Sequence, residues 1–109
     1  MALNKSDIFT LKDQQLALLA KALSHPARIA ILKVLATKNE CVCGDIVLEI
    51  PLAQSTVSQH LKELKTAGLI TGSIDGSKSC YCINRTMLKK FNQSISQLFE
   101  SITDKLKCC

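Results

Sequence analysis

The part of this chain that says most about its architecture is LAQSTVSQHLKEL, residues 52–64. Its apolar residues recur at a spacing that places them on one narrow side of a helix: Ala53, Val57, Leu61 and Leu64. The opposite side carries small or neutral polar side chains and a single charge: Ser55, Ser58, Gln59 and Lys62. Exposed helix surfaces are often stabilised by Glu/Lys pairs, whereas short donors and acceptors suit the base edges of the DNA major groove. The segment therefore predicts a helix that reads DNA.

This helix is expected to span about 53–67 and to end at Gly68 in a left-handed conformation. The backbone N–H groups of its first turn favour phosphate. Ser58, Gln59 and Lys62 are expected to reach the bases, and Ser55 and Thr56 could contact either phosphate or base. We interpret His60 as a base or phosphate contact, because no cysteine neighbours it in the sequence. The predicted DNA contacts on the helix are Gln54, Ser55, Thr56, Ser58, Gln59, His60 and Lys62.

Length and composition indicate one domain, residues 1–109, with a core of aliphatic side chains. Hydrophobic residues make up 47% of the chain and aromatic residues 4%. A small chain with long Leu/Ile stripes often completes its core across a dimer interface. The longest apolar run, residues 16–20, is far too short to span a membrane, and the first residues form no secretory signal. We expect a cytoplasmic homodimer.

The net charge of +5 is concentrated near the proposed reading helix. Residues 53–90 contain six Lys or Arg and two acidic residues, so they hold +4 of the total. This distribution suits phosphate contact, although a mildly basic solvated surface is the alternative interpretation.

Three helices are expected before the reading helix. The first spans about Asp7–Ala22, and the second spans about Pro26–Ala36 with Ser24 as a capping residue. A short third helix, Ile46–Glu49, is expected to begin at Asp45 and to end before Pro51.

A β-hairpin is expected after the reading helix. Asp75-Gly76 lies between two β-prone segments, which is a strong hairpin signal. Asn84 can cap a long last helix. The pattern predicts a mainly α fold with a small β-hairpin, a winged helix-turn-helix. Its helix-turn-helix covers about 45–67, its wing about 69–83 and its C-terminal dimerisation helix about 85–107. The wing tip, Gly76, Ser77 and Lys78, is expected to contact phosphate or the minor groove; a purely structural sheet is the alternative.

Three segments together resemble the ArsR/SmtB family of bacterial metal-responsive repressors: LSHPAR at 23–28, QSTVSQHLK at 54–62 and AGLI at 67–70. The resemblance covers most of residues 15–92. It implies a homodimeric winged-helix repressor, joined through its first and last helices, that leaves its operator when a toxic metal or metalloid binds.

Cys41-Val42-Cys43 looks like the Cys-Val-Cys box of the arsenite, antimonite and cadmium sensors of that family, where the box starts the helix before the reader. The arsenite sensors often carry a further Cys where this chain has Ile46. The family's zinc, cobalt and nickel sensors use His on the last helix, which this chain lacks. The resemblance therefore implies Cys41 and Cys43 as metal ligands, with a third thiol from elsewhere.

Four other cysteines could supply that thiol. A short strand before the third helix commonly pairs with the second wing strand in winged helices, which would bring Cys80 and Cys82 beside the box. The alternative source is the tail, Cys108 and Cys109. Three thiolates suit As(III) or Sb(III), whereas four suit Zn(II) or Cd(II). Without a secretory segment the thiols are expected to be reduced, and Cys80 and Cys82 could also be ordinary core residues.

The leading hypothesis is a non-enzymatic DNA-binding repressor, with no permanent cofactor, induced by As(III) or Sb(III). The second is a thiol redox or persulfide sensor that joins Cys41 or Cys43 to Cys108 or Cys109. The third, a dithiol reductase, lacks a Cys-x-x-Cys motif and a clustered acid–base set in the sequence.

Overall fold

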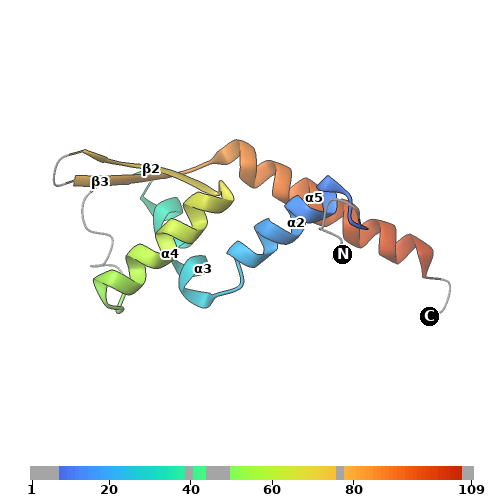
Figure 1. Ribbon diagram of the computed structural model, residues 1–109, viewed down its shortest axis with the longest axis horizontal. Coiled ribbons are helices and arrows are strands. Elements are labelled where there is room, and N and C mark those ends of the chain that lie inside the picture. Colours follow the sequence, from blue (N-terminus) through green and yellow to red (C-terminus); the bar gives the residue numbers. More distant parts are fainter. Residues whose placement is uncertain (1–7, 39–40, 44–49, 76–77, 107–109) are drawn as a thin grey trace, which may run out of the picture.

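The computed structural model describes residues 8–38, 41–43, 50–75 and 78–106, and at 41–43, 73–75 and 78–79 the backbone only. The elements are α2 (Leu11–Ala22), α3 (Pro26–Thr37), β1 (Cys41–Cys43), α4 (Gln54–Ala67), β2 (Ile70–Asp75), β3 (Lys78–Ile83) and α5 (Arg85–Lys105). Figure 1 shows α3 and α4 on one side of the β2–β3 hairpin. The expected helix at 46–49 with its cap Asp45, the wing tip at Gly76 and Ser77, and the tail cysteines Cys108 and Cys109 lie outside the described residues.

The first helix begins later than expected, whereas the second begins at Pro26 as predicted but with a different capping residue. Thr10 has extended backbone angles and its hydroxyl accepts a hydrogen bond from Asp13 N at 3.1 Å, so α2 begins at Leu11 rather than near Asp7. His25, not Ser24, caps α3, because its Nδ1 accepts from Ala27 N at 3.0 Å.

Helix α4 packs against α3 and β2 through its apolar side. Val57, Leu61 and Leu64 are buried there, whereas Ala53 stands exposed at the N-cap. The cluster that receives them includes Ile31, Leu35, Leu69 and Ile70. Gly68 ends the helix at φ +89°, as predicted, a conformation that a residue with a Cβ rarely adopts.

The sheet has three antiparallel strands in the order β1-β3-β2. The expected hairpin is therefore extended by a strand formed by the Cys-Val-Cys segment. Gly72 lies opposite Tyr81 in the register, and a Cβ at position 72 would overlap the Tyr81 ring. Tyr81 and Ile83 pack against the core, so this side of β3 faces the helices.

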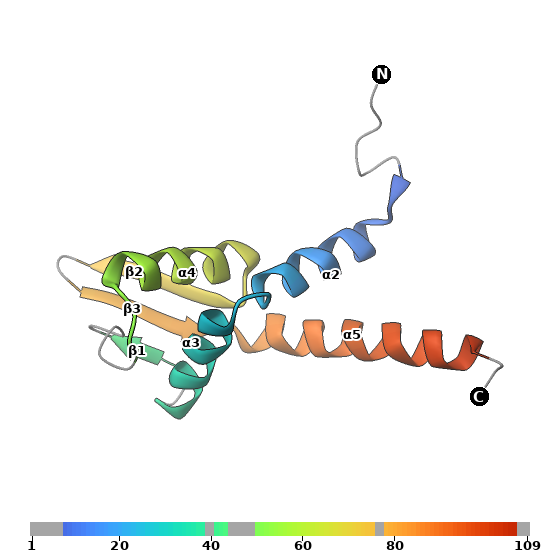
Figure 2. The same ribbon diagram turned by 90° about the horizontal axis from the view of Figure 1, so that it is seen from below.

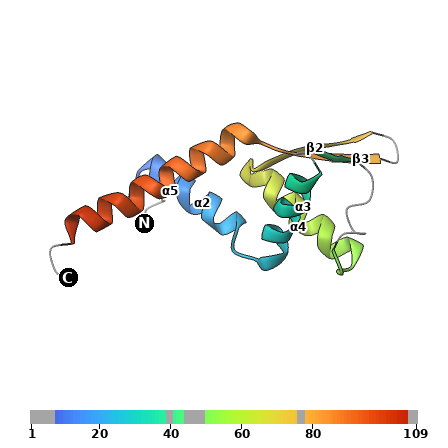
Figure 3. The same cartoon turned by 180° about the vertical axis from the view of Figure 1, so that it is seen from behind.

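Helix α5 starts after Asn84, whose Oδ1 accepts from Met87 N at 3.2 Å, which confirms the predicted cap. Figures 2 and 3 show α2 and α5 extending together from the body formed by α3, α4 and the sheet. Phe91 is the one buried residue of α5. Within the described residues, no helix is long and apolar enough to cross a membrane.

Replacing Leu64 by Ala should destabilise the fold, because the Leu64 side chain has no exposed surface and packs from α4 into the core. The expected loss is about 2–5 kcal/mol. Thr66→Ala changes an exposed residue of the same helix and should stay within about 0.5 kcal/mol of the parent protein. Urea unfolding at one fixed protein concentration measures both; equal midpoints for the two variants would contradict this packing.

Candidate nucleic-acid interface

One side of α4 is a continuous polar surface open to solvent. All of the residues predicted there except His60 are exposed. The buried residues Val57, Leu61 and Leu64 hold the other side of the helix against the protein. We call the exposed set the α4 strip: Gln54, Ser55, Thr56, Ser58, Gln59 and Lys62.

The chemistry of the strip is mostly neutral hydrogen bonding. Gln59 Nε2 donates to Glu63 Oε1 at 3.2 Å, which leaves the amide oxygen of Gln59 as a further acceptor. Lys62 and Lys65 are exposed on the same helix and add positive charge. Such a surface can pair with base edges while its lysines attract phosphate.

The N-terminus of α4 is free of side-chain capping. Ala53 occupies the N-cap position and makes no side-chain hydrogen bond to the first turn. The N–H groups at the start of the helix, with the positive end of its dipole, are therefore directed at solvent where a phosphate can approach.

His60 is the exception among the predicted contacts, and its assignment to the DNA-facing side was wrong. Only 8% of its surface is exposed. Its ring lies 4.3 Å from that of His25 (centroid to centroid), and its Nδ1 accepts a hydrogen bond from Arg28 Nε at 3.2 Å. Position 60 follows Val57 and precedes Leu61 and Leu64 on the helical period, so the side chain turns inward.

Arg28 joins three elements around His60, a role that the sequence did not reveal. Its Nη1 donates to Lys21 O at 3.1 Å, at the end of α2, while its Nε reaches α4. Because Arg is only a donor, His60 Nδ1 is the acceptor and the neutral ring carries its proton on Nε2. Burial lowers the pKa of His60 below the ordinary 6.5, and the nearby His25 and Arg28 lower it further. Residues 28 and 60 are too far apart in the sequence for helical periodicity to pair them.

Four cysteines occupy facing positions on two strands. In the register Cys41 lies opposite Cys82 and Cys43 lies opposite Cys80, which confirms the expected strand pairing. The box is a strand here, not the start of a helix as the resemblance implied. Cys80 and Cys82 are half-buried and disulfide-bonded, contrary to the expected reduced thiols. Among the side chains that the structure describes, no group of three or more His, Cys, Asp or Glu could hold a metal ion.

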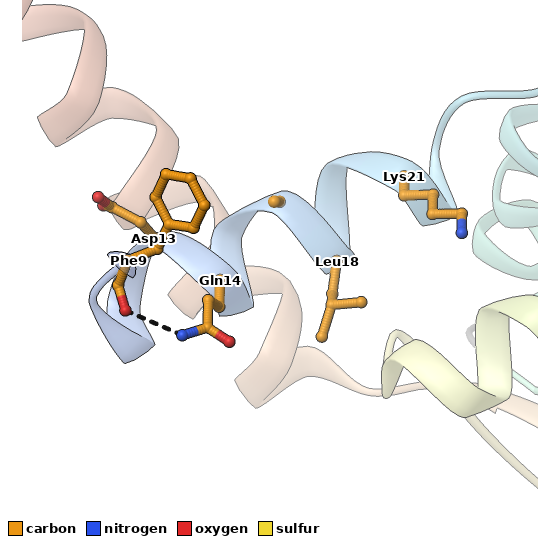
Figure 4. A pocket seen from close by; sticks show the side chains of 6 residues that line it. Phe9, Asp13, Gln14, Leu18 and Lys21 are labelled. Carbon is orange, nitrogen blue, oxygen red and sulfur yellow. Dashed lines mark hydrogen bonds between the residues drawn. The ribbon is translucent and has the colours of Figure 1, made fainter. Parts of the chain in front are cut away.

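Large apolar side chains remain exposed on α2 and α5. Leu18 is 62% exposed and Phe99 59%. On α2 a shallow pocket, with Phe9 and Leu18 at its wall, opens to solvent beside Gln14, whose Nε2 donates to Phe9 O at 2.9 Å (Figure 4). The large apolar residues exposed on α5 and directly after it are Leu88, Leu98, Phe99, Ile102 and Leu106. Apolar surface of this extent on two adjacent helices is typical of an interface.

The chain resembles known bacterial regulators in sequence. Residues 25–71 match the model of the bacterial regulatory protein, arsR family. An arsenical resistance operon repressor of Staphylococcus xylosus is 33% identical over 82 residues, covering 75% of this chain and 78% of that protein.

Solved structures share the fold. An ArsR-like transcriptional regulator from Rhodococcus superposes with a TM-score of 0.70 at 20% identity, over 85% of this chain and 87% of that one. A homodimeric winged helix-turn-helix DNA-binding domain from Mycobacterium bovis superposes with a TM-score of 0.61 at 22% identity, over 99% and 92%. The architecture is therefore a mainly helical winged helix-turn-helix.

The buried His60 predicts a loss of stability on mild acidification. Its folded-state pKa lies below 6.5, so as the pH falls below about 6.5 the unfolded chain takes up a proton before the folded one does. The contribution of His60 to the free energy of unfolding is complete above that pH and declines below it. His60→Asn keeps an acceptor near Arg28 but does not titrate, and should show a weaker dependence in urea unfolding between about pH 7 and 5. Parallel curves for the two proteins would refute this assignment.

Proposed function

The chain belongs to the ArsR family of bacterial regulatory proteins, and from this premise we propose a homodimeric repressor that leaves its operator when a thiophilic metal or metalloid binds its cysteines. As a member of this family it is a DNA-binding transcriptional repressor and not an enzyme, which removes the dithiol reductase alternative.

The observation that carries the DNA-reading part is the exposure of the α4 strip above a fully buried opposite side. We assign base contacts to Ser58, Gln59 and Lys62. Gln54, Ser55 and Thr56 contact phosphate at the helix start, where the N-cap residue Ala53 makes no side-chain hydrogen bond to the backbone N–H groups. His60 holds the helix in place from inside.

The wing and the dimer complete this arrangement. The tip of the β2–β3 hairpin, Gly76, Ser77 and Lys78, contacts the DNA backbone or the minor groove beside α4. A second copy covers the exposed apolar sides of α2 and α5, and two reading helices then meet successive major grooves.

The inducer is a soft ion, As(III) or Sb(III) as first choice and Cd(II) or Zn(II) as alternatives, with Cys41 and Cys43 as ligands. Cys80, Cys82, Cys108 and Cys109 are the candidates for the remaining ligands. A route to the DNA surface exists through the sheet: β1 pairs with β3, β3 with β2, and β2 packs on α4. Leu69 N also donates to Leu64 O at 3.1 Å, which ties the start of the hairpin to the end of α4. Distortion of β1 can thus shift the reading helix.

A second candidate is a thiol redox or persulfide sensor. The disulfide bonding of Cys80 and Cys82 favours it. The oxidised cysteines would then lie in the sheet. The sequence had instead suggested a disulfide to the tail cysteines Cys108 or Cys109.

A fluorescence-anisotropy titration separates these candidates. Reduced protein is bound to a labelled duplex that it has selected from a random pool, and As(III), Sb(III), Cd(II), Zn(II) or peroxide is added. Release by a soft ion supports the metal-responsive repressor. Release by peroxide alone supports the redox sensor, and failure to select any duplex contradicts both.

Ser58→Ala with Gln59→Ala should remove the preference for the selected duplex, because both side chains are placed at base edges. Residual binding should remain sensitive to salt and equal on random DNA. Each lost base contact is expected to cost about 1–3 kcal/mol of discrimination. Thr66→Ala, on the same helix but outside the strip, is the matched control. Equal weakening on selected and random duplexes would argue against base reading by this helix.

Cys41→Ser with Cys43→Ser should keep DNA affinity and lose release by arsenite, since serine preserves size but is not a thiolate ligand. The same anisotropy assay measures both properties. If the double variant is released by the concentration of arsenite that releases the parent, the inducer binds elsewhere.

A further inference from the structure

The four cysteine positions of the two Cys-x-Cys segments lie on one face of the sheet. Residues two apart on a strand share a face, and residues directly opposite on neighbouring strands share it too. The pairs Cys41–Cys82 and Cys43–Cys80 are separated by one rung, Val42–Tyr81. The four cysteine positions therefore form the corners of a small rectangle. Its sides are about 5 Å between strands and about 6.6 Å along them.

This rectangle lies on the face of the sheet that points away from the core. Tyr81 and Ile83 of β3 pack against the core cluster, so the alternate residues Cys80 and Cys82 belong to the other face. Figure 1 shows α3 and α4 on the core side of the hairpin. Cys80 and Cys82 are half-buried, which leaves them open to a small ion. They are not core residues.

The neighbouring strand places neutral residues directly beside the cysteines, and its one charged residue on this face, Asp75, lies opposite Lys78, one pair further along. In the register β2 places Thr71 opposite Cys82 and Ser73 opposite Cys80. Neither residue is a carboxylate or imidazole, so sulfur is the only strong metal donor among these six positions. Hydroxyl groups beside thiolates are suitable donors for hydrogen bonds to the ligand sulfurs.

We propose that Cys41, Cys43, Cys80 and Cys82 of a single subunit form one four-sulfur ion site. This proposal rests on the proposed function and deepens it, because it selects the sheet cysteines over the tail as the missing ligands. In a tetrahedral zinc site with bonds of about 2.3 Å the sulfurs lie about 3.8 Å apart, a spacing that side chains on facing strand positions can reach. Cd(II) or Zn(II) uses all four sulfurs, and As(III) uses three of them.

The disulfide bonding of Cys80 and Cys82 supports the closeness of sulfurs here, because each sulfur is already within bonding distance of another. It also sets a condition for binding. A cellular dithiol must first donate two electrons and two protons per disulfide, giving two cysteine thiols while the donor becomes a disulfide. Ion binding then displaces the thiol protons. The oxidised sheet cannot bind the ion.

The test is a Cd(II) titration of the reduced full-length protein in the absence of oxygen. Sulfur-to-cadmium charge-transfer absorption reports the number of thiolates, and native mass spectrometry reports the number of ions per subunit. The variants are Cys80→Ser with Cys82→Ser and, as matched control, Cys108→Ser with Cys109→Ser.

The parent and the tail variant should bind one ion per subunit with the absorption of four thiolates. The sheet variant should lose about half of that absorption. Its affinity should fall more than about a hundredfold, because loss of even a supporting hydrogen bond costs about 10–100-fold. Unchanged binding in the sheet variant, or loss in the tail variant, overturns the proposal. If the double sheet variant does not fold by circular dichroism, the single Cys80→Ser and Cys82→Ser variants should each lose about a quarter of the absorption; the full absorption in either overturns it.

Anisotropy on the selected duplex keeps this proposal separate from the proposed function. A four-thiolate ion that leaves DNA binding unchanged supports the site and contradicts induction through it. If the variant Cys80→Ser with Cys82→Ser binds the ion with unchanged affinity and the ion still releases it from DNA, the four-sulfur site is contradicted. The proposed metal-responsive repressor is then still supported.

Discussion

Burial of one side of α4 is the constraint on which the rest of this structure depends. Val57, Leu61 and Leu64 are almost completely removed from solvent, against α3 and the strand that follows α4. Loss of apolar surface from water drives this packing, and the helical period then leaves the polar residues of the α4 strip no position except the surface. The same hydrophobic contact therefore stabilises the fold and presents the proposed reading surface.

A polar contact refines the position of that helix. Arg28 reaches from α3 to the His60 ring while also bonding the last carbonyls of α2. Three helices thus meet at one hydrogen-bonded point at the edge of the core. His60 accepts this hydrogen bond as a neutral ring. The contact therefore orients α4 relative to α3 without placing a further charge inside the protein.

The three-stranded sheet connects the cysteine positions to α4 through strand pairing and packing. The core side of β3 carries Tyr81 and Ile83, and its outer side carries Cys80 and Cys82. One strand therefore belongs both to the packing that supports α4 and to the proposed ion site. An ion that draws β1 and β3 together changes the sheet on which α4 rests. The proposed induction would therefore need no signalling element besides the sheet.

Local patterns in the amino-acid sequence were sufficient to predict many of the secondary-structure elements of this protein. The 3.6-residue period of 52–64 predicted α4 and its exposed strip, Asp75-Gly76 predicted the hairpin, and Gly68 and Asn84 predicted helix ends that the structure confirms. These features depend on neighbours within a few residues. The hydrogen bond between Arg28 and His60 and the cysteine register depend on residues that are 32 to 41 positions apart. Such contacts are chosen by the packing of whole elements: the core determines which helices meet at His60, and strand pairing determines which cysteine lies opposite which.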